Sequence, residues 1–371
     1  MGRILVTGGA GFIGSFMVDE LVKKGHFVKI FDNLEKQVHL GKIPDYLNKN
    51  AEFINNDITN YDALKEAIAN TDTIIHLASV VGVGQSMYAI RKYVNSNTLG
   101  TAILLDILAN EEHDVKKLLV ASSMSTYGEG SYNCKKCGLI EPKLRDEEQM
   151  SKKEWEVKCP KCDSVLKPIP TTEEKKQDLN SVYALTKKDQ EDMCLLVGKS
   201  YGIKTVALRY FNVYGPRQSL SNPYTGVAAI FLSRIKNNNQ PIIFEDGLQT
   251  RDFVSVHDIV SANLLAMERN AANYEIFNVG TGNQITIKSI SEVLAKLCNK
   301  DIRPNITHNF RRGDVRHCFS DITKIRNKLG FSPKISFEDG MRELVQWSET
   351  TMSYDKVGIA TEELKKKGLL L

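Results

Sequence analysis

Short apolar runs alternate with amphipathic stretches along the first half of the chain. Aliphatic and β-branched runs predict strands over residues 3–7, 27–32, 52–55, 73–78, 117–123 and 205–211. After the first run, Phe16, Met17 and Leu21 recur at helical spacing, and Gly25 is placed to end that helix. Nearly continuous apolar strands that alternate with helices are typical of a parallel sheet covered on both faces. We therefore predict an α/β fold with a doubly wound parallel sheet.

Two regions depart from this alternation. Residues 131–176 are rich in charge and proline, and after Tyr214 the pattern becomes less regular. There we expect a helix over 222–235, a short strand within 241–247, and a return to the sheet over 251–266 and 274–282. A smaller α/β domain is thus interleaved with the first. The predicted divisions are 1–130, 173–212 and 252–282 for the first domain, 131–172 for an insert, 213–251 and 283–352 for the second domain, and 353–371 for a tail without an assigned role.

Composition limits the classes of protein that fit. Of 371 residues, 42% are hydrophobic and 25% are charged, which is ordinary for a globular protein, and the net charge is only +4. This charge is too small to indicate nucleic-acid binding, and no apolar run is long enough to span a membrane. The N-terminus reads as a strand and not as a secretion signal. We expect a cytoplasmic protein that binds neither nucleic acid nor membrane.

The first loop has the pattern of a dinucleotide site. Gly8, Gly11 and Gly14 follow a predicted strand and open a predicted helix, so the backbone can approach a pyrophosphate at the helix N-terminus. Asp32 ends the next strand, where its carboxylate can accept hydrogen bonds from ribose hydroxyls and would repel a 2′-phosphate. The pattern predicts NAD as the cofactor in preference to NADP. The alternative is a glycine-rich turn without a ligand.

A tyrosine and a lysine supply candidate acid–base chemistry. Tyr183 and Lys187 are four residues apart on a predicted helix and so share one face. A nearby ammonium group favours the phenolate, which can then act as a general base. This spacing alone also fits a solvent-exposed helix face. Ser123 adds weight, because it ends a predicted strand at the sheet edge where such folds keep their sites.

Several motifs in order resemble one family. The stretches "TGGAGFIG", "HLAS", "NTLGT", "SSMSTYG", "YALTK", "RYFNVYGP" and "RDFVSVHD" are similar to those of extended short-chain dehydrogenases/reductases, and most of all to the nucleotide-sugar epimerases of that group. The resemblance covers residues 1–350 apart from the insert. It implies a Rossmann-type NAD-binding domain, a nucleotide-sugar-binding domain, a Ser–Tyr–Lys catalytic set at Ser123, Tyr183 and Lys187, and a homodimer joined by a four-helix bundle.

The resemblance also implies roles for further residues. Those for the cofactor are Gly8, Gly11, Phe12, Ile13, Gly14, Asp32, Asn33, Asp57, Ile58, Leu77, Ala78, Ser79, Asn97, Tyr183, Lys187 and Tyr210. Those for a nucleotide-diphosphate sugar are Ser86, Ser123, Ser125, Asn212, Val227, Phe244, Arg251 and Arg311. Arginine suits bidentate contact with phosphate, so the two arginines are expected at the diphosphate.

The residues after Ser123 bear on the reaction. Related 4,6-dehydratases carry an Asp–Glu pair there, whereas this chain has Met124 and Ser125. Neither side chain can replace a carboxylate in water elimination, so epimerisation is favoured, at C4 of the sugar. Tyr183 would take the hydroxyl proton with help from Lys187, and Ser123 would hydrogen-bond the sugar oxygen. A reductase that uses NADP is the alternative that Asp32 disfavours.

Two CxxC pairs in the insert predict a metal site. Cys134 and Cys137 are separated by 21 residues from Cys159 and Cys162, a spacing typical of tetrahedral zinc bound by four thiolates. Such a site has no open position, so the zinc is expected to be structural. Redox pairing within each CxxC is the alternative. The other cysteines, Cys194, Cys298 and Cys318, are expected to be core thiols.

The place of the insert indicates its role. It separates Ser123 from Tyr183, so we expect it beside the sugar pocket, where it would shape sugar selectivity or the dimer surface. With "VGVGQSMY" and "SNPYTGVAAIF", it resembles a subgroup that includes dTDP-L-rhamnose 4-epimerases. Two alternatives stay open: a UDP-hexose or UDP-hexuronate 4-epimerase, and a non-catalytic NAD-binding scaffold that recruits a partner through the insert.

Overall fold

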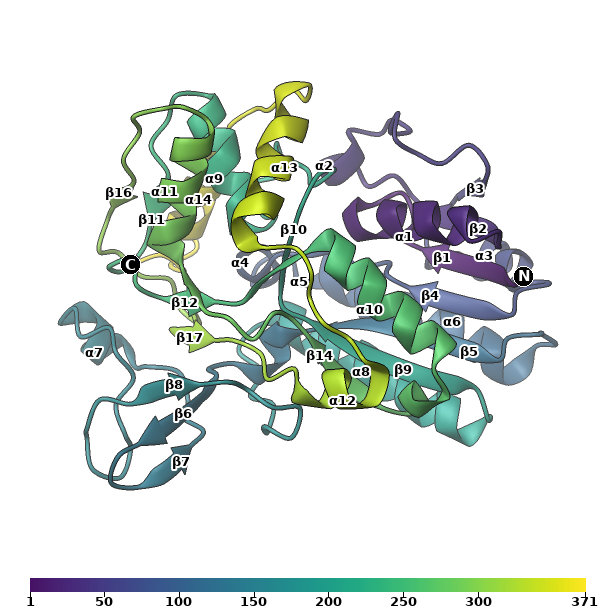
Figure 1. Cartoon of the computed structure of the whole chain (residues 1–371), viewed down its shortest axis with the longest axis horizontal. Helices are drawn as coiled ribbons and strands as arrows, with labels where there is room; N and C mark the ends of the chain where they lie inside the picture. The colour runs from purple at the N-terminus through teal and green to yellow at the C-terminus, as the bar shows by residue number, and fades with distance from the viewer.

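A seven-stranded parallel sheet forms the centre of the protein, which a computed structural model describes over residues 1–371 (Figure 1). The strand order is β14-β9-β5-β4-β1-β2-β3, and every neighbouring pair runs parallel. All residues of β5 are buried, as expected of an inner strand. The strands are β1 (Arg3–Thr7), β2 (Phe27–Asp32), β3 (Glu52–Asn55), β4 (Thr73–His76), β5 (Lys117–Ser123), β9 (Lys204–Tyr210) and β14 (Ile276–Val279).

The six predicted strands are all in this sheet, with small changes at two of them. β4 ends at His76 and not at Ala78, because the Ala78 N–H donates to the Thr7 hydroxyl at 3.3 Å instead of to a neighbouring backbone carbonyl. β9 begins and ends one residue before the predicted range. The doubly wound parallel sheet predicted from the apolar runs is confirmed.

Helices cover the two faces of the sheet and bury two separate cores. On one face Met17, Ile259 and Ile325 pack against the strands, and on the other Leu64, Leu104 and Cys194 do so. The helices of the first face are α1 (Phe12–Lys23), α10 (Val256–Glu268) and α12 (Thr323–Leu329). Those of the second are α3 (Tyr61–Ile68), α6 (Gly100–Asn110) and α8 (Val182–Ser200).

Short helical segments line the carboxyl edge and the connections of the sheet. They are α2 (Lys36–His39), α4 (Val83–Ser86), α5 (Ile90–Tyr93), the π-helix η1 (Val94–Leu99) and the 3-10 turns η2 (Met124–Tyr127) and η3 (Asn270–Ala272). α5, η1 and α6 follow one another without a break, and η1 contacts α8. None of the helices combines the length and the apolar character that a membrane span requires.

The residues after Tyr214 build a third core beside the sheet. Its helices are α9 (Val227–Lys236), α11 (Ile287–Leu297) and α13 (Phe337–Glu349), and Leu232, Leu294 and Leu344 meet between them. Small sheets join this core: β10 (Asn212–Tyr214) with β13 (Phe253–Ser255), β11 (Ile242–Ile243) with β16 (Asn305–Ile306), and β15 (Ile285–Thr286) with β12 (Thr250–Arg251) and β17 (His317–Cys318).

Two expectations for this region need correction. α9 starts at Val227 and not near residue 222, because the Asn222 side chain accepts the Tyr224 N–H at 3.0 Å and holds a turn in place of the helix. The stretch 251–266 does not return to the central sheet. Its strand β13 pairs with β10 instead, and only β14 from the stretch 274–282 joins the central sheet.

The insert forms a small antiparallel sheet apart from the central one (Figure 1). Residues 131–172 form the ribbon segment. Its elements are β6 (Ser131–Cys134), β7 (Gly138–Ile140), β8 (Lys167–Ile169) and the short helix α7 (Glu147–Ser151). A core of four apolar side chains and two cysteines holds it together: Tyr132, Ile140, Val157 and Leu166 with Cys134 and Cys159.

The tail returns to the body of the protein. Its helix α14 (Val357–Lys366) places Leu364 3.4 Å from the position a Cβ on Gly84 would occupy. After it, backbone hydrogen bonds join Leu369 and Leu371 to residues 310–312, the longest being 3.1 Å. The tail therefore packs on both α4 and the loop that carries Arg311.

Candidate active site

One cavity of about 670 Å³ runs from the glycine-rich loop after β1 to the loop that carries Arg311. This volume is in the range of sites for small organic ligands. Most of the predicted site residues line it. They are Gly8, Gly11, Phe12, Ile13, Gly14, Asp32, Asn33, Ile58, Leu77, Ala78, Ser79, Ser123, Ser125, Tyr183, Lys187, Tyr210, Asn212, Val227, Phe244, Arg251 and Arg311.

Three predicted residues lie outside the cavity lining. Asp57 accepts hydrogen bonds from Asn33 at 2.7 Å and from the Thr59 hydroxyl at 2.7 Å. Ser86 is buried, and its hydroxyl donates to a backbone carbonyl. Asn97 is also buried and brackets Val80, accepting its N–H at 2.7 Å and donating to its carbonyl at 3.1 Å. These side chains hold neighbouring segments in place and do not face the cavity.

The glycine-rich loop packs tightly against its neighbours and leaves the start of α1 open to the cavity. Gly8 has φ +71°, and a Cβ there would lie 2.8 Å from the Ala78 nitrogen. A Cβ on Gly14 would collide with the Gly8 carbonyl oxygen. No side chain caps the N-terminus of α1, so its free N–H groups and positive dipole end face the cavity. The loop fits the pyrophosphate of a dinucleotide.

Asp32 is held where the adenosine end of such a ligand would lie. Its carboxylate accepts the Ala10 N–H at 3.1 Å and the Leu34 N–H at 2.9 Å, and the side chain is only 9% exposed. Burial raises the pKa of Asp32, while the hydrogen bond from Leu34 opposes that shift. A buried acceptor with fixed orientation matches the hydroxyls of an unphosphorylated ribose. The residues present therefore fit NAD.

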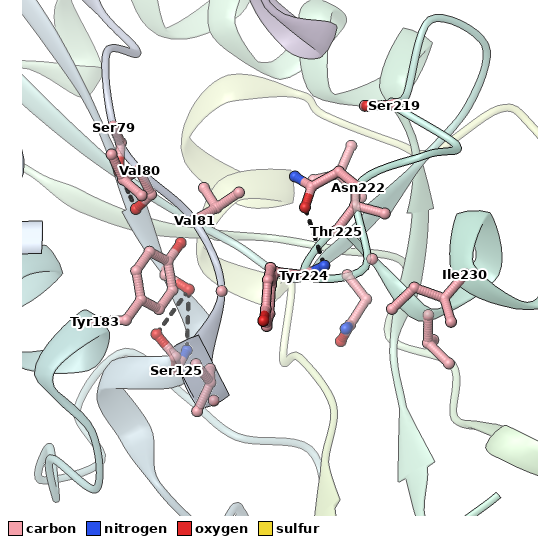
Figure 2. Close-up of a pocket in the computed structure, with 18 of the residues that line it drawn as sticks. Ser79, Val80, Val81, Ser125, Tyr183, Ser219, Asn222, Tyr224, Thr225 and Ile230 are labelled. Carbon is pink, nitrogen blue, oxygen red and sulfur yellow. Dashed lines mark hydrogen bonds between the residues drawn. The ribbon is translucent and has the colours of Figure 1, made fainter. Parts of the chain in front are cut away.

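The predicted catalytic residues come together from β5 and α8. Ser123 ends β5, and its Oγ accepts hydrogen bonds from the Ser125 N–H at 3.1 Å and the Ser125 hydroxyl at 2.9 Å. Tyr183 lies in the first turn of α8, near Ser125 (Figure 2). Lys187 is one turn further along and donates to the Ala121 carbonyl at 2.9 Å and to Gln190 at 2.8 Å. All three side chains line the cavity.

The acid–base properties of this set differ from the expectation. Burial raises the pKa of Tyr183 to about 12, and a hydrogen bond with Ser123 partly opposes it. Burial also lowers the pKa of Lys187 to about 7. The pKa of Tyr183 is thus raised and not lowered as expected from Lys187, because burial outweighs the hydrogen bond with Ser123. A phenolate here needs additional positive charge near the ring.

The far end of the cavity has unsatisfied polar atoms. The side-chain oxygens of Asn212, Gln218 and Gln249 are buried and have no hydrogen-bond partner. All three residues line the cavity, and buried acceptors without partners are uncommon in folded proteins. Donors on a bound ligand would satisfy them.

The two predicted phosphate arginines are at this end. Arg251 donates to the backbone carbonyls of Thr250 at 2.8 Å and Arg316 at 3.0 Å, and no carboxylate pairs with it. Arg311 donates to Asp314 at 2.7 Å and lies over the Phe244 ring, 5.1 Å from its centre. Arg251 therefore has the larger unneutralised positive charge. Both guanidinium groups can approach a diphosphate.

Sequence reasoning missed part of the cavity wall. Gln218 and Gln249 lie in irregular loops and give no periodic signal. Tyr224 lies across the cavity from Tyr183 (Figure 2). The tail, to which no role was assigned, contributes Ala360, Leu364 and Leu369 to the lining. The one signal in the sequence that could have indicated this packing is the apolar run at the end, Leu369–Leu371.

Four cysteines in the ribbon segment form a cluster of the size that a metal site requires. The Sγ atoms of Cys134, Cys137, Cys159 and Cys162 all lie within 4.8 Å of one another, and none is in a disulfide. Tetrahedral zinc with four thiolates places sulfurs about 3.8 Å apart. The cluster therefore fits zinc, and all four positions would be taken by protein ligands.

Comparisons with known proteins agree with this geometry. The model of the NAD dependent epimerase/dehydratase family matches residues 4–149, and that described as GDP-mannose 4,6 dehydratase matches residues 165–344. A dTDP-L-rhamnose 4-epimerase from Burkholderia thailandensis is 33% identical over 353 residues, which cover 93% of this chain and 94% of that protein.

Solved structures extend the likeness to the fold. The UDP-glucose 4-epimerase of Thermotoga maritima with UDP-glucose has a TM-score of 0.76 and 33% identity, covering 94% of this chain and 99% of that one. The UDP-glucuronic acid 4-epimerase of Bacillus cereus with UDP-glucuronic acid and NAD has a TM-score of 0.74 and 28% identity, covering 94% and 100%. These neighbours support NAD binding and a nucleotide-sugar substrate.

Proposed function

Because the chain belongs to the NAD-dependent epimerase/dehydratase family of nucleotide-sugar enzymes, we propose that it is a 4-epimerase that acts on dTDP-L-rhamnose. The observation that carries the proposal is the single cavity. It joins the dinucleotide loop, Ser123 with Tyr183, and the two arginines Arg251 and Arg311. A dinucleotide and a nucleotide-diphosphate sugar can meet in it with the sugar next to Tyr183.

Tyr183 is the general base and general acid of the proposed reaction. Bound NAD supplies the acceptor, and then the donor, of the hydride at C4. Tyr183 as phenolate takes the proton of the C4 hydroxyl, and Ser123 donates a hydrogen bond to the same oxygen. Lys187 as ammonium holds the phenolate. The 4-keto sugar would then rotate within the cavity to present its other face, and Tyr183 would return the proton to the C4 oxygen.

The far end of the cavity holds the rest of the substrate. Arg251 and Arg311 contact the diphosphate, and the Asn212 oxygen accepts a hydrogen bond from the ligand. Phe244 and Val227 form apolar walls near the base. Fixing the diphosphate at these points leaves the small sugar ring free to turn about the bond that links it to phosphate. This mode of binding is what a reaction on both faces of C4 requires.

The choice of sugar rests on two observations. Met124 lines the cavity next to Ser123 and gives it an apolar patch that suits the methyl group of a 6-deoxy sugar. The Burkholderia relative, matched over almost the whole chain, is a dTDP-L-rhamnose 4-epimerase. The second candidate is a UDP-hexose or UDP-hexuronate 4-epimerase, favoured by solved neighbours that hold UDP-glucose and UDP-glucuronic acid.

Zinc and a second copy of the chain complete the proposal. The four cysteines would hold structural zinc at the end of the ribbon segment. A homodimer would form through α8 and the helices before it, where large apolar side chains are exposed. Those side chains are Met87, Ile90, Val94 and Leu99 on α5, η1 and their flanks, and Leu185 and Leu196 on α8. An exposed apolar face on two adjacent long helices is typical of an interface between subunits.

A substrate panel tests the function. Purified protein without added reductant is incubated with dTDP-L-rhamnose, UDP-glucose, UDP-galactose and UDP-glucuronic acid, and the sugar protons are followed by NMR. We expect the C4 epimer from dTDP-L-rhamnose. Turnover of a UDP-sugar alone would replace the substrate and keep the mechanism. No turnover of any sugar by protein that contains NAD would contradict the enzyme assignment and favour the scaffold alternative.

A further inference from the structure

The loop that carries Arg311 is held from two sides by parts of the chain outside the central sheet. On one side Phe310 packs against Trp155 of the ribbon segment, with ring centres 6.4 Å apart. On the other side the Phe310 N–H donates to the carbonyl of Leu371 in the tail at 2.8 Å. Arg312 is held in the same way. Its guanidinium pairs with Glu147 of the ribbon segment at 2.7 Å, and its backbone N–H donates to the Leu369 carbonyl at 3.1 Å.

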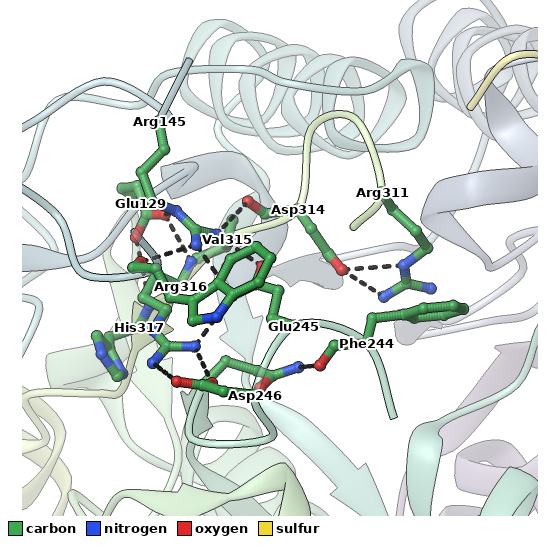
Figure 3. Close-up of polar contacts among 12 residues, drawn as sticks. Glu129, Arg145, Phe244, Glu245, Asp246, Arg311, Asp314, Val315, Arg316 and His317 are labelled. Carbon is green, nitrogen blue, oxygen red and sulfur yellow. Dashed lines mark hydrogen bonds and ion pairs between the residues drawn. The ribbon is translucent and has the colours of Figure 1, made fainter. Parts of the chain in front are cut away.

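A buried ion network joins the ribbon segment to the same region (Figure 3). Arg145 of the ribbon segment donates to both oxygens of Glu245 at 2.9 Å, and the two side chains are 1% and 2% exposed. Arg316 donates to Glu245 at 3.0 Å and to Asp246 at 2.7 Å. Glu156 of the ribbon segment accepts from Arg316 at 3.1 Å. The pairs of Arg145 and Arg316 with Glu245 are shielded from solvent, so they fix positions far better than surface pairs do.

Glu245 connects this network to the cavity. Its φ is +55°, a left-handed conformation that is costly for a residue with a side chain. Two arginines therefore hold Glu245 in a strained backbone. The residue before it is Phe244, whose ring lies under the Arg311 guanidinium (Figure 3). A shift of Glu245 would move Phe244 and the face on which Arg311 rests.

The second phosphate arginine depends on the same network. Arg251 donates to the backbone carbonyl of Arg316 at 3.0 Å. The Arg316 side chain is fully buried in the network, and the backbone N–H of Arg316 donates to the Glu129 carboxylate at 2.6 Å. The Arg316 carbonyl that orients Arg251 is thus held in place by the side chain and N–H of Arg316, one of the two arginines of the network.

Removing one arginine would increase an excess of negative charge that the network already has. The buried and half-buried members are Arg145 and Arg316 on the positive side, and Glu129, Glu156, Glu245 and Asp246 on the negative side. Loss of Arg145 leaves a single arginine among four carboxylates. Buried carboxylates without partners drive local rearrangement or take up protons.

We propose that Arg145 of the ribbon segment is a positioning residue for the nucleotide diphosphate: through Glu245 and Arg316 it fixes Phe244, Arg311 and Arg251 in the geometry that binds phosphate. The inference rests on the proposed function, since it assigns the nucleotide diphosphate to that end of the cavity. Arg145 itself does not line the cavity. The ribbon segment thereby acts on substrate affinity and not on the chemistry at Tyr183.

Arg145→Met tests this inference, because methionine keeps the length of the stem and removes the guanidinium. Binding of dTDP and of UDP is measured by calorimetry, and kcat and KM are measured with the substrate found in the panel. We expect the Kd of the nucleotide and the KM to rise by about tenfold or more, with kcat changed by less than about threefold and NAD content unchanged. Lys158→Met is the matched control, since Lys158 pairs only with solvent-exposed Glu154 on the same segment.

A double variant separates positioning from general damage. In Arg145→Met/Glu245→Gly, glycine accepts the positive φ without strain and the unpaired carboxylate is gone. We expect it to bind dTDP more tightly than Arg145→Met does. If Arg145→Met does not fold, Trp155→Leu replaces it, because this change loosens Phe310 and removes no charge. It should weaken dTDP binding and leave the NAD content intact.

The outcomes are distinguishable. Unchanged dTDP affinity in Arg145→Met, or in Trp155→Leu where the first variant does not fold, would overturn the positioning role. A rise in KM matched by an equal fall in kcat and in NAD content would also overturn it, since it would report loss of the whole fold. Failure of the unaltered protein to bind either dTDP or UDP would instead contradict the proposed function.

Discussion

The catalytic end of the cavity and the junction between the ribbon segment and the third core use buried charge in opposite ways. At the catalytic end Lys187 is buried and has no carboxylate partner, only a carbonyl and an amide oxygen. Burial lowers its pKa to about 7. At the junction Arg145 and Arg316 are equally buried, but each donates to carboxylates.

The difference reflects what each region does. An uncompensated buried lysine is costly, and its proton affinity responds to any charge placed beside it. The arginines of the paired network stay charged far above neutral pH, so near neutral pH the network keeps a fixed geometry. The first arrangement suits proton transfer, and the second suits the orientation of a loop. Changes at the catalytic end should therefore lower kcat, whereas changes at the junction should lower the affinity for the nucleotide.

The largest effect is expected at the catalytic end. Tyr183→Phe removes the acid–base group and keeps the ring, so kcat should fall by about 10³-fold, in the range of general acid–base contributions. The KM and the affinity for dTDP should stay within about threefold, because the arginines at the far end are untouched. Activity is measured by NMR and dTDP binding by calorimetry.

Tyr93→Phe is the matched control for that experiment. The Tyr93 ring is 6.3 Å from that of Tyr183, and its hydroxyl donates to the Val81 carbonyl at 2.9 Å. The substitution removes the hydroxyl of this neighbouring buried tyrosine and leaves the proposed base, Tyr183, in place. We expect kcat within about threefold of the unaltered protein. A comparable loss in both variants would show that disturbance of the packing around Tyr183, and not removal of the proposed base, lowers kcat.

Loss of the cysteine cluster should have the next largest effect, and on the other region. Cys159→Ser/Cys162→Ser removes one of the two CxxC pairs. It also changes the core of the ribbon segment, because Cys159 is one of the two cysteines, with Cys134, among the six residues of that core. We expect about one zinc per chain to be lost, measured by mass spectrometry, and dTDP affinity to fall as in Arg145→Met. Structural zinc contributes several kcal/mol to the folding of small modules.

Cys298→Ser is the control for the cysteine variant. Cys298 is a half-buried thiol at the edge of the third core and is outside the cluster. Its replacement should leave the metal content and the dTDP affinity unchanged. Full zinc content in the double variant would rule out the cluster as the metal site, and unchanged dTDP affinity after zinc loss would break the link between the ribbon segment and the substrate end.

How far the sequence predicts each region follows from how local its signals are. The glycine-rich loop, the strands and the spacing of Tyr183 and Lys187 are patterns within a dozen residues. In the structure the loop joins β1 to α1, the six predicted strands lie in the central sheet, and Tyr183 and Lys187 are one turn apart on α8. The cysteine cluster is also recognisable from its spacing. The ion network is not, since Arg145 and Glu245 are 100 positions apart and charged residues are usually expected on the surface.

The same reasoning explains what was missed at the substrate end. The tail reaches the cavity through packing of Leu364 and through backbone pairing, and neither leaves a motif in the sequence. The pKa of Tyr183 is set by burial, which depends on the closed fold around it. Such properties need the tertiary structure, whereas the cofactor loop is encoded by the residues that form it.

The smallest effect is expected from Glu156, which lies at the rim of the ion network. Burial alone would raise the pKa of Glu156, but hydrogen bonds from His317 and Arg316 outweigh it and lower the pKa from 4.5 to about 2. A carboxylate with a lowered pKa contributes stability that is fully present above pH 4.5 and is lost as the pH falls toward 2. Because the side chain is 40% exposed, solvent screening limits this contribution to about 1 kcal/mol.

Thermal unfolding of Glu156→Gln at several pH values measures that contribution. The midpoint of the variant should lie below that of the unaltered protein at pH 7, and the difference should shrink steadily below pH 4.5. Glu154→Gln is the control: its carboxylate pairs with Lys158 in solvent, so its midpoint should match that of the unaltered protein at pH 7. A difference for Glu156→Gln that stays constant down to pH 3 would show that packing, and not charge, holds the rim of the network. The junction would then resemble an ordinary core more than the paired network that sets it apart from the catalytic end.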